Sequence, residues 1–211
     1  MYDAIFFDLD GTLIDTERLA VQTGAAAFAA FGHQDSEDLL MRLIGVDQPT
    51  SARLIAEACP GIDAVALRQH WNAGFDDALA HEVPMKPGAR ELVQDLARQH
   101  PLALVTSSGR AAALDKLTRS GLMPSFRAII AREDVTQPKP APEPYLLAAS
   151  RLGARAERCL VFEDSEPGAE AAHAAGMRVV QVADLLPPTG RFAHHVAADL
   201  RSGAAWAGLA V

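Results

Sequence analysis

The segment Ala4-Ile5-Phe6-Phe7-Asp8-Leu9-Asp10-Gly11-Thr12 carries the strongest fold signal in the sequence. Its apolar run, residues 4–9, is typical of a strand that is buried on both faces of a parallel sheet. The carboxylates at positions 8 and 10 lie on the same side of an extended chain, with Leu9 on the other side. Gly11 then permits a tight turn. The segment therefore predicts a buried strand that ends in two neighbouring acids.

Four further apolar segments have the same character and alternate with amphipathic helical patterns. They span residues 102–105, 127–130, 159–162 and 178–182. Strands that alternate with helices predict right-handed crossovers and a parallel sheet covered by helices on both faces. The expected fold class is therefore α/β, with a Rossmann-like parallel sheet as its core. The segment from Pro188 onward predicts little beyond a short terminal helix.

The alternation is interrupted between Thr16 and Val83, where the sequence has helical periodicity and no convincing strand pattern. Ten acids against four arginines give this stretch a net charge of −6, compared with −8 for the whole chain. A linker rich in Pro and Gly follows at 81–88. We therefore expect a core domain formed by residues 1–15 and 84–211, and an inserted α-helical domain at 16–83.

Composition excludes several classes of protein. The chain has 211 residues, of which 49% are hydrophobic, so it is able to bury a core. The net charge is −8 and the basic residues are isolated, which argues against a nucleic acid or an anionic membrane as partner. No apolar run approaches 18 residues, no signal-like segment begins the sequence, and two cysteines cannot form a disulfide framework. We expect a cytoplasmic protein with no membrane or nucleic-acid partner.

Chemically active side chains follow three of the predicted strands. Asp8 and Asp10 follow the first strand, Thr106-Ser107-Ser108 the second, and Glu163-Asp164 the fourth, while Lys139 lies in a loop between two prolines. Ligands of open parallel sheets bind beyond the carboxyl ends of the strands, so we expect these side chains to converge. Clustered carboxylates favour Mg²⁺, and an ammonium with hydroxyls suits a phosphoryl group. Ser108 is expected to cap the next helix.

Four motifs in this order resemble those of the haloacid dehalogenase superfamily of phosphotransferases: Asp8-Leu9-Asp10-Gly11-Thr12-Leu13, Thr106, Lys139-Pro140 and Glu163-Asp164-Ser165. A helical insertion directly after the first motif resembles the small-cap subgroup, which includes phosphoglycolate phosphatase-like enzymes and β-phosphoglucomutase. The resemblance implies a Mg²⁺-dependent phosphatase with an inserted cap domain. Its partner would be a small phosphorylated metabolite, and a monomer is the expected state.

The resemblance also implies a role for each matched residue. Asp8 would be the nucleophile that forms an aspartyl-phosphate, and Asp10 would be the general acid and base. Mg²⁺ would be bound by Asp8, the backbone carbonyl of Asp10 and Asp164, with Glu163 helping directly or through water. The phosphate oxygens would be held by Thr106, Lys139 and the backbone near Ser107. In the cap, Gln48 of the loop 45–48 would contact the substrate.

Four alternatives to phosphatase activity share this core. A phosphomutase would return the phosphoryl group to a sugar, but β-phosphoglucomutase-like sequences carry a His where this chain has Ala20, and an Arg that the loop 45–48 lacks. A non-catalytic phosphate-binding module is disfavoured because every chemical group of the motifs is present. Asp10 argues against dehalogenation, and the absence of lysine between Thr16 and Glu82 argues against phosphonate cleavage.

Overall fold

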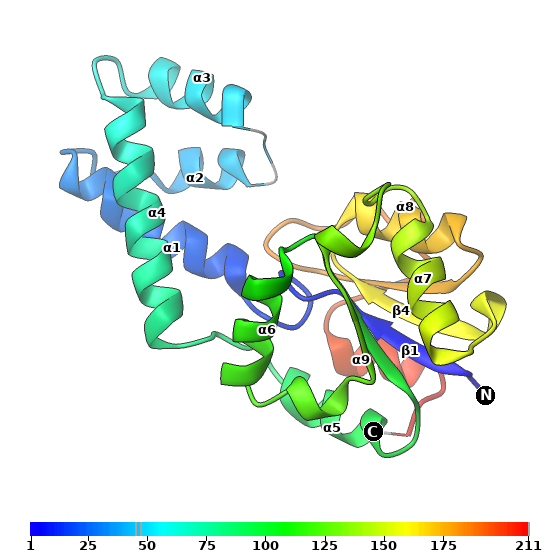
Figure 1. Ribbon diagram of the computed structural model, residues 1–211. Coiled ribbons are helices and arrows are strands. Elements are labelled where there is room, and N and C mark those ends of the chain that lie inside the picture. Colours follow the sequence, from blue (N-terminus) through cyan, green and yellow to red (C-terminus); the bar gives the residue numbers. More distant parts are fainter. Residues whose placement is uncertain (45, 47, 211) are drawn as a thin grey trace. The chain divides into compact units, whose positions relative to one another are not determined.

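A computed structural model describes residues 1–44, 46 and 48–210, and the chain forms two compact units (Figure 1). The larger unit combines Met1–Asp15 with Met85–Val211, and the smaller unit is Thr16–Pro84. No helix in the described part of the chain has the length and apolar character needed to cross a membrane. Both cysteines, Cys59 and Cys159, are buried and free.

A six-stranded parallel sheet forms the centre of the larger unit, in the order β3-β2-β1-β4-β5-β6. Its strands are β1 (Ala4–Phe7), β2 (Leu102–Val105), β3 (Ala128–Ile130), β4 (Cys159–Glu163), β5 (Arg178–Val182) and β6 (His195–Ala197). The predicted α/β class with a parallel sheet is confirmed. The sixth strand was not predicted, because only one of its three residues is buried and it has no apolar run.

Helices cover both faces of the sheet, which explains why its first two strands, β1 and β2, are apolar and buried throughout. On one face, α7 (Glu143–Leu152) and α8 (Glu166–Ala174) share a core with Phe6 and Val161. On the other face, α9 (Leu200–Trp206) approaches Phe162 through Gly203, and α5 (Ala89–Ala97) packs beside α9. Adjacent residues of a strand point to opposite faces, so Val161 and Phe162 are both buried.

The first strand is shorter than the predicted 4–9, and its end is where the chain turns into the functional loop. The Asp8 N–H still donates to the Phe162 carbonyl at 3.0 Å, which holds this residue beside β4. Beyond it, the Leu9 carbonyl accepts from Leu13 and Ile14, both at 2.9 Å. Gly11 has φ of 92°, a conformation that favours glycine. The turn expected from the sequence is therefore present.

The chain passes between the units twice. The residues just before the insertion and those just after it are held together within the larger unit. The Lys86 N–H donates to the Leu13 carbonyl at 2.9 Å, and Ile14 forms an isolated bridge with Met85. The Lys86 ammonium also forms ion pairs with Asp184 and, at 3.5 Å, with Asp15. The backbone on both sides of the insertion is therefore fixed by the core.

The smaller unit consists of helices in its described residues: α1 (Thr16–Ala30), α2 (Glu37–Leu43), α3 (Gln48–Ala58) and α4 (Ala64–His81). Its core contains Phe28 and Trp71, whose rings meet edge to face at 6.1 Å. The Trp71 indole donates to the Ala20 carbonyl at 2.9 Å, and this bond links α4 to α1. Asp63 caps α4 by accepting from the N–H groups of Val65 and Ala66. These contacts give the helical unit a core of its own.

Two glycines of this unit form a matched pair for testing its packing. Gly24 in α1 is buried, and a Cβ there would lie 2.6 Å from Trp71, whereas Gly74 in α4 has open space around it. We expect Gly24→Ala to lower the free energy of unfolding by about 1–3 kcal/mol through overpacking. Gly74→Ala should raise it by roughly 0.5–1 kcal/mol, because alanine loses less backbone entropy in a helix. Thermal unfolding followed by circular dichroism measures both, and a shift of the same sign for the two variants would contradict this packing.

Candidate active site

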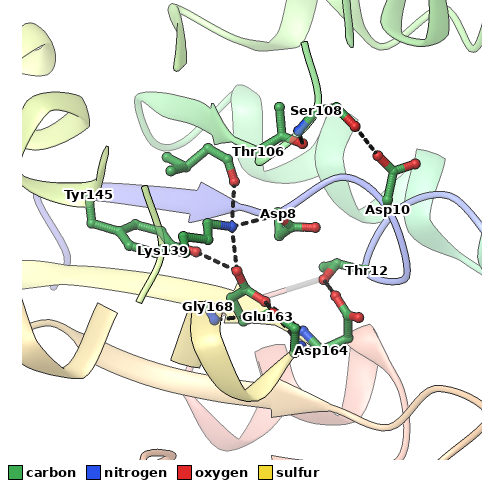
Figure 2. A network of polar contacts seen from close by, with 12 residues as sticks. Asp8, Asp10, Thr12, Thr106, Ser108, Lys139, Tyr145, Glu163, Asp164 and Gly168 are labelled. Carbon is green, nitrogen blue, oxygen red and sulfur yellow. Dashed lines mark hydrogen bonds and ion pairs between the residues drawn. The ribbon is translucent and has the colours of Figure 1, made fainter. Parts of the chain in front are cut away.

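A pocket of ≈ 270 Å³ lies at the carboxyl edge of the sheet. The chain positions β1, β2, β4 and one loop so that polar side chains face this pocket (Figure 2). Its lining consists of Asp8, Asp10, Thr106, Ser107, Ser108, Lys139 and Ser165. The structure therefore brings together residues that the sequence separates by more than 150 positions.

The ammonium group of Lys139 is at the centre of this edge and contacts three strand ends. It lies 2.6 Å from the Asp8 Oδ1 after β1, donates to the Val105 carbonyl of β2 at 2.9 Å, and forms an ion pair with Glu163 of β4. The Lys139 side chain is only 5% exposed. An ammonium has three donors, and these three contacts use all of them. The position of Lys139 is therefore set by the sheet itself.

The carboxylate of Glu163 is fully buried and has a partner for each oxygen. Its Oε1 accepts from the Tyr145 hydroxyl at 2.9 Å and from Lys139. Its Oε2 accepts from the N–H groups of Asp164 and Ser165, both at 3.1 Å, and from the Ser165 hydroxyl at 3.0 Å. Helix α8 approaches so closely that a Cβ on Gly168 would lie 1.7 Å from Oε1. This close approach explains the glycine at position 168.

Asp164 lies beside the first loop and is held by it. The Thr12 hydroxyl donates to its Oδ1 at 2.6 Å, and the Gln181 amide donates to its backbone carbonyl at 3.1 Å. A Cβ on Gly11 would lie 2.3 Å from Oδ2 of Asp164. Glycine is therefore required here for two reasons, the conformation of the turn and the close approach of Asp164. Thr12 is fully buried, and its role in holding Asp164 was not predicted from the sequence.

Three of the acids are close enough to share one cation. One oxygen from each of Asp8, Glu163 and Asp164 lies within 4.8 Å of the other two. Burial raises the pKa of Asp8 to about 7, opposed by the attraction of Lys139 and assisted by repulsion from Glu163. Burial and the neighbouring carboxylates also raise the pKa of Asp164 well above its usual value. An all-oxygen set of mutually repelling acids fits a hard divalent cation such as Mg²⁺.

The Asp10 carboxylate points to the other side of the pocket, toward Ser108 (Figure 2). Its Oδ2 accepts from the Ser108 hydroxyl at 2.6 Å, and its Oδ1 lies 2.5 Å from the ammonium of Lys116. The prediction that Ser108 caps the next helix was wrong. That helix, α6 (Arg110–Arg119), begins one residue later with Gly109 in the cap position, so the Ser108 hydroxyl is available to Asp10.

Thr106 and Ser107 follow β2 as expected. The Thr106 N–H donates to the Ile130 carbonyl of β3 at 2.9 Å, and its hydroxyl accepts from the Ser108 N–H at 3.0 Å. Thr106 is buried and Ser107 is exposed, and both side chains line the pocket. Both residues therefore line the same pocket as Lys139.

Besides the role of Thr12, the sequence analysis missed two residues of the site, Lys116 and Tyr145. Both lie inside helices, on α6 and α7, and no strand end or loop marks them. For Lys116 a compositional signal existed, because the chain has three lysines against 16 arginines. The side chain of the predicted contact residue Gln48 lies outside the described part of the structure, and residues 45 and 47 of its loop are not among the described residues.

Comparison with known proteins gives one family and several similar enzymes. The family model for haloacid dehalogenase-like hydrolases matches residues 5–182. The chain is 32% identical over 177 residues to a phosphorylated carbohydrates phosphatase of Thermotoga maritima, covering 83% of this chain and 82% of that protein. It is 32% identical over 182 residues to a fructose-1-phosphate phosphatase of Escherichia coli, covering 86% of this chain and 96% of that protein.

A solved structure shares the fold over nearly the whole chain. A crystal structure of a haloacid dehalogenase family hydrolase from Deinococcus radiodurans, with bound phosphate and sodium, superimposes with a TM-score of 0.85 at 28% identity. The match covers 98% of this chain and 96% of that one. The similarity thus extends over both units of the chain.

Proposed function

The chain belongs to the haloacid dehalogenase-like hydrolase family, and we propose that it is a Mg²⁺-dependent phosphatase that hydrolyses small phosphomonoesters through an aspartyl-phosphate on Asp8. The observation that carries the proposal is the Lys139 ammonium, 2.6 Å from Asp8 in a pocket that Asp10 and four hydroxyl residues also line. A carboxylate nucleophile, a fixed cation and hydroxyl donors are the groups that phosphoryl transfer needs. The two similar phosphatases support a phosphorylated carbohydrate or related small metabolite as substrate.

The proposed reaction has two steps that use the same residues. In the first, an Asp8 carboxylate oxygen attacks phosphorus, the bond to the ester oxygen breaks, and Asp10 gives its proton to the departing alcohol. In the second, Asp10 takes a proton from water, water attacks phosphorus, and the bond to Asp8 breaks to release inorganic phosphate. Lys139 is charged before the reaction begins, because the carboxylates of Asp8 and Glu163 outweigh burial and raise its pKa above the usual value.

Mg²⁺ would be held by Asp8, Asp164 and the backbone carbonyl of Asp10 in this proposal. When bound, it would neutralise the repulsion between the clustered acids and the phosphoryl oxygens. The sequence left open whether Glu163 binds the ion directly. We assign Glu163 to Lys139 instead, because both of its oxygens already accept from protein donors and its side chain is fully buried.

We propose that the helical unit 16–83 acts as a cap that selects the substrate, with Gln48 in its contact loop. Its net charge of −6 makes a polyanion costlier to bring near than a single phosphate group. Position 20 has only a methyl side chain, and the loop 45–48 contains no arginine. The backbone carbonyl of Ala20 already accepts from the Trp71 indole. The cap therefore lacks the side chains with which a mutase would hold a second phosphate.

Replacing Asp8 tests the nucleophile. Asp8→Asn should abolish turnover of 4-nitrophenyl phosphate, because an amide of nearly the same shape cannot attack phosphorus. The variant should remain folded, since an amide oxygen still accepts from Lys139 and one of several repelling charges is removed. Steady-state kinetics and thermal unfolding are measured together, with Asp115→Asn on α6 as an exposed control. If Asp8→Asn keeps more than about a tenth of wild-type turnover, Asp8 is not the nucleophile.

The metal proposal predicts a shift in stability that does not depend on turnover. Mg²⁺ at 100 times its dissociation constant should stabilise the metal-free protein by about 2.7 kcal/mol and raise its Tm. Asp164→Asn removes a proposed ligand but keeps an acceptor for Thr12, so this rise should be lost. Asp115→Asn should retain it. An equal rise in Tm for wild type and Asp164→Asn would exclude Asp164 as a ligand.

The products distinguish a phosphatase from a phosphomutase. With β-glucose 1-phosphate and a trace of glucose 1,6-bisphosphate, we expect inorganic phosphate as the main product, or no reaction. The reason is that the cap lacks the groups that would bind a bisphosphate in two orientations. Water should therefore attack the phosphorylated Asp8 faster than a sugar hydroxyl does. Coupled assays for free phosphate and for glucose 6-phosphate give the ratio. Glucose 6-phosphate forming faster than phosphate would establish the mutase alternative.

A further inference from the structure

The three lysines of the chain are all bound to acids of the larger unit. Lys139 pairs with Asp8 and Glu163, Lys116 with Asp10, and Lys86 with Asp184 and Asp15. Their side chains are 5%, 10% and 13% exposed, whereas the cations of surface pairs such as Arg98 and Arg53 are 72% and 62% exposed. A compact ammonium and a planar guanidinium are not interchangeable at such places. The chain has 16 arginines, so the presence of lysine at these three sites needs a physical reason.

Lys116 is the lysine that contacts the proposed acid and base. It lies in the last turn of α6, and its backbone carbonyl accepts from the Ser120 N–H at 2.9 Å, which fixes the end of the helix. Its ammonium lies 2.5 Å from Oδ1 of Asp10, while the Ser108 hydroxyl occupies Oδ2 at 2.6 Å. The Asp10 side chain is 28% exposed and lines the same pocket as Asp8. Both of its oxygens are thus held by neighbours.

We propose that Lys116 is a positioning residue for Asp10, which holds one carboxylate oxygen so that the other is presented to the leaving group and to water. The proposal rests on the proposed function, since it gives Lys116 a part only if Asp10 transfers a proton. Without Lys116, the carboxylate would be fixed by the single bond to Ser108 and would be free to rotate about its side-chain torsions. A misplaced acid loses much of its contribution to a reaction.

The chemistry of the two neighbours decides which oxygen carries the transferred proton. An ammonium has donors only, so it cannot accept a bond from a protonated Oδ1. A serine hydroxyl both donates and accepts, and it can therefore remain bonded to Oδ2 whether or not that oxygen is protonated. Lys116 thus leaves Oδ2 as the oxygen that gives and takes the proton, beside Ser108 at the pocket wall.

Two aryl esters that differ only in the leaving group test this role. 4-Nitrophenolate leaves without a proton, whereas phenolate needs one, so only phenyl phosphate depends strongly on Asp10. We expect Lys116→Met to lower kcat/KM for phenyl phosphate by about tenfold or more, and for 4-nitrophenyl phosphate by less than about threefold. Arg119→Met, which removes a cation from the same helix, should leave both values unchanged. An equal loss on the two esters would show that Lys116 only supports the fold.

A double-mutant cycle separates action through Asp10 from independent action. Asp10→Asn alone should show the same selective loss on phenyl phosphate, and adding Lys116→Met should lower kcat/KM no further. Losses that multiply in the double variant would overturn the proposal. Should Lys116→Met not fold, Lys116→Arg replaces it: the larger, planar guanidinium does not fit the space of the ammonium without moving the Asp10 carboxylate, so the same selective loss is expected. An unselective loss in that variant would count against positioning.

The activities of wild type and the variants distinguish a wrong role for Lys116 from a wrong proposed function. If wild type hydrolyses neither ester, or Asp8→Asn remains active, the proposed function is wrong and the role of Lys116 is refuted with it. If wild type is active and Asp10→Asn discriminates between the esters while Lys116→Met does not, the phosphatase stands and only the positioning role is wrong.

Discussion

The buried ammonium of Lys139 is the interaction on which the rest of the structure depends. It joins the ends of three strands through Asp8, the Val105 carbonyl and Glu163, none of which is near it in sequence. A buried charge is tolerated only when it is paired, and removing the ammonium would leave two buried carboxylates without a cation, at a cost of about 3–5 kcal/mol. Lys139 therefore links the alignment of the strand ends to the charge balance of the pocket.

This condition extends outward through Glu163 to the helices behind the sheet. The Tyr145 hydroxyl of α7 and the close approach of Gly168 of α8 both act on Oε1 of Glu163. Because burial and the Glu163 charge raise the pKa of Tyr145 well above its usual value, this hydroxyl remains a donor. One carboxylate thus connects the packing of two helices to the position of Lys139. The geometry of the pocket therefore depends on the helices α7 and α8 as well as on the residues that line it.

The sequence predicted the parts of the site that depend on the parallel sheet, and missed the parts that depend on how helices pack. Asp8, Thr106 and Glu163 stand at strand ends, and the rule that these ends share one edge brings them together. Lys116 has no such marker, because the distance from α6 to Asp10 is set by tertiary packing alone. Ser108 was misassigned since a helix start is uncertain by one residue, and that residue decides whether its hydroxyl faces the helix or Asp10. Strand β6 was missed because two of its three residues are not buried.

The proposed chemical residues all belong to the larger unit, so the insertion is free to vary without altering them. What the insertion could disturb is the backbone that leads into it, since only five residues separate Asp10 from Thr16 where the smaller unit begins. The partly buried Lys86 acts on this short stretch. Lys86 binds Asp15 on one side and Asp184 after β5 on the other, and the bridge between Ile14 and Met85 closes the same loop. Ion pairs of this kind hold the outgoing and returning chain against the sheet. The substrate selection that we propose for the helical unit and the phosphoryl transfer that we propose for the core would thereby be separated at this boundary, so the insertion could change without moving the residues of the pocket.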